Sequence, residues 1–113
     1  MKNLAAITSA VESLRKIDMH MDMGTALVFL LIAQFPGCSL KELQRLTGID
    51  RSATSRHGLI LTARGDICRG RKGMGLAEQR PDGRDARIKR YFLTKKGADL
   101  AATLNVIISK KAA

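Results

Sequence analysis

Apolar residues recur along the chain at helical spacing and stop at polar or glycine-rich breaks. The first such series predicts an amphipathic helix over residues 2–17. Segment 17–24 interrupts the pattern and is expected to form a linker or turn. Residues 25–35 are apolar nearly all round, which is typical of a buried helix, and Pro36-Gly37 should end it. The residues that carry the first series are Leu4, Ile7, Val11 and Leu14.

Two short helices with capping signals are expected next. Ser39 and Glu42 have the spacing of a capping box, in which the hydroxyl accepts from a free backbone N–H and the carboxylate reaches back. This helix should end at Gly48, and Asp50 should cap a second helix over residues 51–63. The short break between them matches a helix-turn-helix. The apolar residues that would bury the pair are Leu40, Leu43, Leu46 and Ile49.

A β-hairpin with a basic tip is predicted further on. The sequence Pro-Asp-Gly at residues 81–83 favours a turn, so residues 76–80 should pair with residues 87–93. An alternative uses residues 66–69 as the first strand, which gives a longer hairpin; the compact one is favoured because it closes over the turn. Residues 65–74, glycine-rich and basic, are then a loop. Thr94 should cap a last helix, whose residues available for packing are Ala98, Leu100, Ala101, Leu104, Ile107 and Ile108.

The order of helix pair, basic hairpin and helix predicts a mainly α fold with a small β-hairpin, a winged helix-turn-helix. A length of 113 residues favours one domain. We expect residues 1–23 to form an N-terminal dimerisation helix and linker, residues 24–96 the winged-helix core, and residues 97–113 a C-terminal helix.

The positive net charge of the chain indicates which class of partner it binds. The net charge is +10, and residues 64–96 alone carry eleven Lys/Arg and four Asp/Glu, a net of +7. Such an excess favours a polyanion, either nucleic acid or an anionic membrane surface. The longest apolar run, residues 26–33, is far shorter than the roughly 20 residues of a bilayer span. Residues 1–13 lack the apolar stretch of a signal peptide, so a cytoplasmic location is expected.

Catalytic, metal and cofactor sites are not predicted. No metalloprotease motif, nucleophile elbow or phosphate-binding loop occurs. His20 lies among methionines, which is weak support for a soft-metal site. Cys38 and Cys68 do not form a secreted disulfide framework, and both thiols are expected to be reduced. Cys68 lies among arginines, where a redox switch is conceivable, but an incidental thiol is favoured.

Two segments resemble the MarR family of bacterial winged-helix regulators. Residues 40–56 are similar to that family's recognition unit. Asp85-x-Arg87, followed by Leu-Thr-Lys-Lys-Gly at residues 93–97, is similar to its wing signature. The resemblance covers roughly residues 25–104 and implies DNA binding, with Asp85 bracing one wing arginine while another reaches the minor groove. The basic loop at 65–74 is similar to variants carried by phages and prophages.

The chain departs from that family in three ways. One helix follows the hairpin where members commonly have two. His57 and Gly58 stand where members usually have larger apolar residues, so the second helix is expected to pack unusually. Aromatic residues make up 4% of the chain and Trp is absent, which argues against the phenolic-ligand pocket of some members.

DNA contacts are expected from the second helix, the hairpin and the basic loop. The N-terminal half of that helix would enter the major groove, where Arg56 could read guanine bidentately. Ser52 and Ser55 would contact phosphates or adapt to the bases, while Thr54 either joins them or faces the core. Arg51 is a phosphate clamp or a surface charge. The expected DNA-binding residues are Arg51, Ser52, Thr54, Ser55, Arg56, Arg71, Lys72, Arg84 and Arg87.

Each basic segment also has a plainer interpretation. Arg84 and Arg87 suit a narrow A·T-rich minor groove, but they could instead form an exposed hairpin ion pair. Arg71 and Lys72, with Arg64 and Arg69, would attract phosphates without regard to sequence, or they are a solvated charge run. The helix residues would then be a solvated face.

The sequence therefore predicts a DNA-binding transcriptional regulator, a homodimeric repressor that reads an inverted repeat in double-stranded DNA. Its expected partners are DNA and a second copy of the chain, and no membrane partner is expected. One alternative is an adaptor that uses the winged helix to bind a protein or an RNA. Another is a DNA-compacting protein, which would show strong salt dependence without a preferred sequence.

Overall fold

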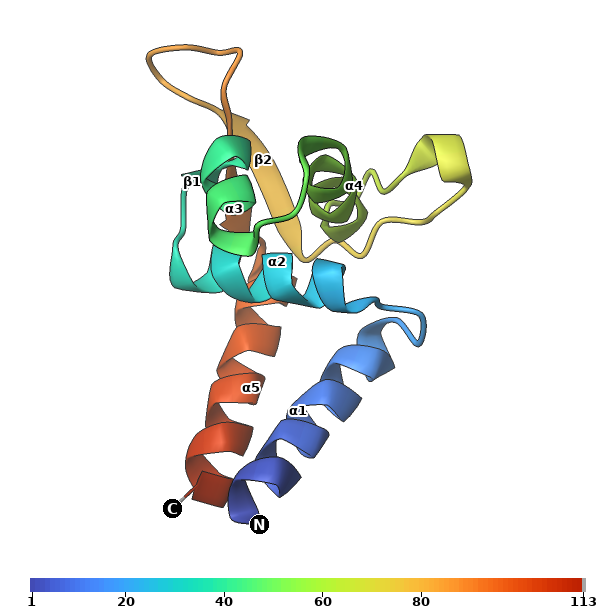
Figure 1. The fold of residues 1–113 in the computed structure, drawn as a ribbon, viewed down its shortest axis with the longest axis vertical. Helices are drawn as coiled ribbons and strands as arrows, with labels where there is room; N and C mark the ends of the chain where they lie inside the picture. The colour runs from blue at the N-terminus through green and yellow to red at the C-terminus, as the bar shows by residue number, and fades with distance from the viewer. Residues whose placement is uncertain (113) are drawn as a thin grey trace.

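The computed structural model describes residues 1–112, so Ala113 of the expected C-terminal segment lies outside the described residues. Four of the five helices pack around a small sheet and the first helix packs against the last, as Figure 1 shows; the sequence predicts this winged-helix fold. The elements are α1 (Lys2–Ile17), α2 (Met23–Gln34), β1 (Cys38–Ser39), α3 (Leu40–Thr47), α4 (Arg51–Leu61), a 3₁₀ turn (Ile67–Arg69), β2 (Ala77–Pro81), β3 (Lys89–Leu93) and α5 (Lys95–Ala112).

Helix starts follow the capping residues. Asp22 Oδ1 accepts from the backbone N–H of Thr25 at 2.7 Å, so α2 begins at Met23, two residues before the predicted start. The predicted caps of the next helices are confirmed: Ser39 Oγ accepts from the Glu42 N–H at 3.2 Å, and Asp50 Oδ1 accepts from the Ala53 N–H at 2.8 Å. The Glu42 carboxylate does not reach back to the backbone as expected; it accepts from the Ser39 hydroxyl at 3.2 Å.

The ends of α3 and α4 have different causes. Gly48 follows α3 with φ of 72°, a left-handed conformation that glycine adopts without steric cost. Helix α4 ends at Leu61, two residues before the predicted end. The returning chain supplies the reason, because the N–H groups of Met74 and Leu76 bond the carbonyls of Ile60 and Leu61 at 2.9 and 2.8 Å.

The sheet has three antiparallel strands in the order β1-β3-β2. Strands β2 and β3 pair from Ala77↔Leu93 to Pro81↔Lys89, which confirms the compact hairpin. The alternative strand at residues 66–69 is wrong, because residues 67–69 form a 3₁₀ turn. Strand β1, which the sequence did not predict, pairs with the opposite edge of β3.

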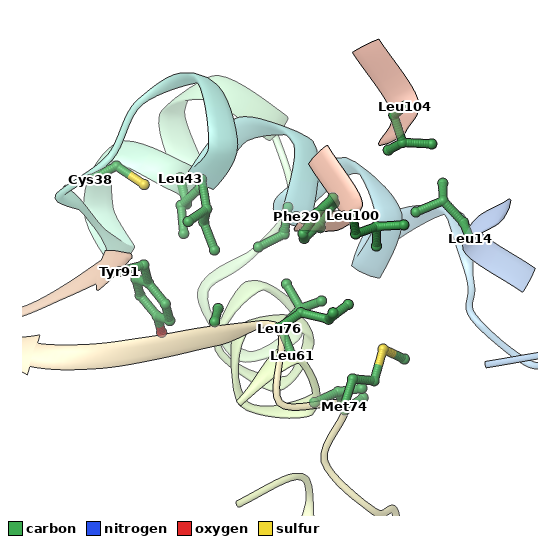
Figure 2. Packing of buried hydrophobic residues seen from close by; sticks show 14 residues of the cluster. Leu14, Phe29, Cys38, Leu43, Leu61, Met74, Leu76, Tyr91, Leu100 and Leu104 are labelled. Carbon is green, nitrogen blue, oxygen red and sulfur yellow. The ribbon is translucent and has the colours of Figure 1, made fainter. Parts of the chain in front are cut away.

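The buried core lies where α2, α3, α4 and the sheet meet (Figure 2). Phe29, Leu43, Leu61, Leu76 and Tyr91 are fully or almost fully buried there. Leu46 and Ile108, both expected to pack, are exposed. The terminal helices contribute three residues to this core: Leu14 from α1, and Leu100 and Leu104 from α5.

Helices α1 and α5 lie side by side at the other end of the molecule, where the N-terminus and the end of α5 are found (Figure 1). Their packing leaves an apolar row of α1 in solvent, including Leu4 and Ile7, each 55% exposed. On α5, Val106 is 62% exposed. The pair therefore presents apolar surface that this chain does not cover.

Candidate nucleic-acid interface

The N-terminal half of α4 presents polar side chains at the surface. Arg51 and Ser52 are exposed, and Ser55 and Arg56 are partly exposed. Because Asp50 caps the helix, its first turn is ordered and these side chains project from a fixed backbone. The arrangement offers hydroxyl and guanidinium groups to a partner that fits against one end of the helix.

Thr54 does not belong to this surface, and its prediction as a DNA contact is wrong. Its side chain is 0% exposed. The hydroxyl donates to the carbonyl of Asp50 at 2.8 Å, one turn earlier in the chain, so its polar atom is satisfied inside the fold. The sequence also left open a position for Thr54 in the core, and this is the position observed.

Two glycines determine how α4 sits on its neighbours. A β-carbon at Gly58 would fall 2.9 Å from the hydroxyl of Tyr91 on β3, and one at Gly24 of α2 would overlap the imidazole of His57. The His57 Nδ1 lies 2.9 Å from the Thr25 hydroxyl oxygen, so the buried ring has a polar partner. His57 and Gly58 are each matched to a residue of complementary size, Gly24 and Tyr91 respectively.

Asp22 adds charge to the His57 contact. Its Oδ1 lies 3.5 Å from Nδ1 of His57. Burial raises the pKa of Asp22, but hydrogen bonds from Thr25 and the nearby His57 and Arg71 outweigh it, so the pKa lies below its ordinary value. The carboxylate is therefore held ionised beside the α2–α4 contact.

The hairpin tip is ordered by its aspartates. Asp82 Oδ2 accepts from the N–H groups of Arg84 and Asp85, each at 3.0 Å. The Asp85 carboxylate accepts two bonds from the Arg87 guanidinium, both at 3.0 Å, and the pKa of Asp85 is lowered chiefly by this contact. The structure thus shows the bracing of one wing arginine that the resemblance implies. Arg84 is exposed at the tip, and the braced Arg87 side chain is still 91% exposed.

The basic loop, residues 65–74, projects on the side of α4 away from the hairpin tip (Figure 1). Arg71 does not point into solvent as expected for a phosphate contact. Its guanidinium donates to Asp18 at 2.7 Å and to the His20 carbonyl at 3.3 Å, which ties the loop to the α1–α2 turn. The exposed cations of this region are Arg64, Arg69 and Lys72.

A cleft of about 720 Å³ separates α3 and α4 from the hairpin. Its lining is rich in cationic and hydroxyl groups, which suits a polyanionic backbone. Two of the predicted helix residues, Arg51 and Ser55, and the wing residue Arg87 meet here. The other lining residues are Ser39, Leu40, Lys41, Gln44, Gln79, Ile88, Lys89, Arg90 and Tyr91.

Sequence reasoning missed Arg90, which lies in the middle strand of the sheet. Its Nε donates to Asp82 at 2.7 Å, and its Nη1 donates to the Gly37 carbonyl at 2.9 Å and lies 3.4 Å from Glu42. Alternation along the strand could have shown that Arg90 and Tyr91 point to opposite faces of the sheet. No local pattern, however, identifies hydrogen-bond partners that are so distant in the sequence.

The remaining expectations concern chemistry and location. Cys38 is buried, Cys68 is exposed, and both are free thiols. Within residues 1–112, no cluster of three or more His, Cys, Asp or Glu side chains is placed to hold a metal ion. No helix in the same range is long and apolar enough to cross a membrane.

Of the comparisons with known proteins, only the one with solved structures finds similar proteins. No protein-family model matches the sequence, and no curated protein matches it. Solved structures match with probability 1.00, among them a MarR family transcription regulator, SP03579, with 20% identity and a TM-score of 0.66. The chain has the MarR fold. A MarR transcriptional regulator from Methanosarcina mazei Go1 is also similar, with 21% identity and a TM-score of 0.68.

The match extends over most of this chain but not over the whole of the relatives with the MarR fold. It covers 97% of this chain and 62% of SP03579, and 89% of this chain and 64% of the Methanosarcina protein. The structure of reduced AbfR bound to DNA is similar at 15% identity, with a TM-score of 0.65 and coverage of 89% and 64%. These structures give no support to the phage or prophage type expected from the basic loop.

Proposed function

We propose that the chain is a sequence-specific DNA-binding transcriptional regulator, a repressor that acts as a homodimer. The observation that carries the proposal is the position of a capped helix, polar at its exposed N-terminal half, beside an arginine-bearing hairpin in a chain of net charge +10. A MarR-fold protein, AbfR, has been solved bound to DNA, which supports the same use of the fold.

Helix α4 is the recognition helix in this proposal. Its N-terminal half enters the major groove, where Arg56 donates two hydrogen bonds to one guanine. Arg51, Ser52 and Ser55 contact phosphates on either side and fix the register. Since Thr54 is buried, it holds the helix and makes no contact with DNA.

The wing and the basic loop contribute charge in different ways. Arg84 at the wing tip enters the minor groove, while Arg87, oriented by Asp85, contacts the adjoining backbone. Lys72, with Arg64 and Arg69, attracts phosphates without regard to sequence. Arg71 holds the basic loop in place through Asp18, so its effect on DNA is indirect.

Dimerisation accounts for the exposed apolar surface of the terminal helices. A second copy would cover Leu4, Ile7 and Val11 on α1 and Val106 on α5, which are otherwise solvated. In this division residues 1–23 and 97–113 serve the dimer, and residues 24–96 bind DNA. Two-fold symmetry then places the recognition helices at half-sites about one helical turn apart. Occupation of a promoter by the dimer, without any enzymatic step, would repress transcription.

A selection from random duplex DNA at near-physiological salt tests the proposal, followed by sedimentation of the chain with the selected duplex. We expect an enriched inverted repeat and two chains per duplex. Binding without an enriched motif would instead indicate a DNA-compacting protein. A failure to bind duplex, together with a stable protein or RNA partner, would favour an adaptor.

A further inference from the structure

Arg90 joins three segments that are far apart in the sequence. From the middle strand, its guanidinium reaches Asp82 at the start of the wing tip, the Gly37 carbonyl before β1, and Glu42 in the first turn of α3. We refer to these four residues as the Arg90 cluster. The Arg90 side chain is 36% exposed, so the cluster is shielded on one side by the fold.

The cluster connects the wing tip to the helix-turn-helix. Asp82 orders the tip, because its second carboxylate oxygen accepts from the backbone of Arg84 and Asp85. Glu42 lies in the first turn of α3, where its backbone N–H donates to Ser39 Oγ and its carboxylate accepts from the Ser39 hydroxyl. One guanidinium therefore holds the turn that orients Arg84 and the helix that packs against α4.

The charges around Arg90 argue against a direct contact with DNA. Two carboxylates, Asp82 and Glu42, lie within 3.4 Å of its nitrogens. The pKa of Asp82 is lowered chiefly by its bond to Arg90, so the carboxylate stays ionised. A phosphate that approached this arginine would meet the two carboxylates, whereas Lys89 beside it on the same strand is exposed.

We propose that Arg90 is a positioning residue that sets the separation between the wing tip and the recognition helix, and through it the choice of bases that flank the major-groove site. The proposal rests on the proposed function, since it assigns the wing to reading DNA. It assigns to Arg90 no contact with DNA.

The test uses Arg90→Met, Asp82→Asn, the double variant, and Lys41→Met as a control that removes an exposed charge from the lining of the same cleft. Amide hydrogen exchange of residues 82–88 is measured without DNA. Affinity is measured for duplexes that share the selected half-sites and differ only in A·T or G·C flanks.

We expect Arg90→Met to speed exchange at the wing tip on the order of tenfold and to abolish the flank preference, while the half-site preference remains. Asp82→Asn should act in the same direction, and the double variant should match Arg90→Met because Arg90→Met already removes the contact with Asp82. Lys41→Met should weaken binding to both duplexes equally and leave exchange at residues 82–88 unchanged.

Unchanged exchange in Arg90→Met would overturn the proposal. So would tighter binding by Asp82→Asn alongside weaker binding by Arg90→Met, because that pattern belongs to a direct contact. If the protein with Met at residue 90 did not fold, Arg90→Lys, which keeps the charge but not the forked geometry, would be measured instead with the same expectation. If the unchanged chain bound no duplex, the proposed function would fail, while the exchange result would still report on the cluster.

Discussion

The ring of Tyr91 on β3 lies directly against the backbone of Gly58 in α4. A β-carbon at residue 58 would be 2.9 Å from both the hydroxyl and a ring carbon of Tyr91. The tyrosine is almost fully buried, and its hydroxyl accepts from the Gln79 side chain at 2.9 Å, so the ring has little room to move. The position of the proposed recognition helix on the sheet therefore depends on a missing side chain.

Gly58→Ala should destabilise the protein. Overpacking against Tyr91 costs about 1–3 kcal/mol. The better helix propensity of alanine returns about 1 kcal/mol, so we expect a net loss of about 1 kcal/mol. Chemical denaturation measures the change. Gly83→Ala is the control, since a β-carbon there would contact nothing within 4 Å, and it should have almost no effect. Equal stability of the two variants would contradict the packing described for Tyr91.

Local signals in the sequence were sufficient for three helix caps and the hairpin, although the Asp22 cap of α2 was not predicted. Asp50 and Thr94 each accept from a backbone N–H three residues later, and this spacing is readable without a structure. The turn at residues 81–83 fixed the hairpin in the same way. Thr54 was misassigned because a threonine that bonds the preceding turn has the same residue type as one that faces DNA.

Long-range pairs could not be predicted, since nothing local encodes them. Arg71 bonds Asp18, which lies 53 residues away in the sequence, and Arg90 bonds the Gly37 carbonyl at the same separation. Strand β1 is two residues long and becomes a strand only by pairing with Tyr91 and its neighbour on β3. In each case charge and residue type were visible in the sequence, but the partner was supplied by the fold.

Lys72 and Arg71 should behave differently although they are neighbours. Lys72→Met should weaken binding to all duplexes alike and reduce the slope of log affinity against log salt by about 1, because one phosphate contact is lost. Asp18→Asn, which removes the negative charge that pairs with Arg71 and keeps every cation, should instead speed amide exchange in residues 65–74. Fluorescence anisotropy and hydrogen exchange measure the two effects. Identical behaviour of the two variants would refute this division.

The two thiols should differ in reactivity. Burial, with a contribution from the nearby Glu42, raises the pKa of Cys38 to about 11, so the reactive thiolate is scarce at pH 8. Cys68 is exposed. In the native protein we expect one thiol to react rapidly with a disulfide reagent and the other only on unfolding. Cys68→Ser should remove the fast phase, and a fast phase that survived it would show that Cys38 is accessible.

Acid should loosen the wing tip. The pKa values of Asp82 and Asp85 lie below the ordinary 3.8, chiefly because of hydrogen bonds from Arg90 and Arg87. A carboxyl whose pKa is lowered by folding stabilises the folded form above its unfolded value and loses that effect as pH falls through the folded value. The amide chemical shifts of Arg84 and Asp85 should therefore stay constant down to about pH 4 and change below it. A change centred well above pH 4 would contradict the assignment.

The measurement that tests the central claim most directly is a binding-site selection run in parallel on the unchanged chain and on Arg56→Ala. We expect the unchanged chain to enrich an inverted repeat. The variant should enrich the same repeat with discrimination lost at one base pair in each half-site, a loss of about 1–3 kcal/mol at that position. An identical motif for both proteins would show that Arg56 on α4 does not read the bases, and the absence of any motif would contradict sequence-specific recognition itself.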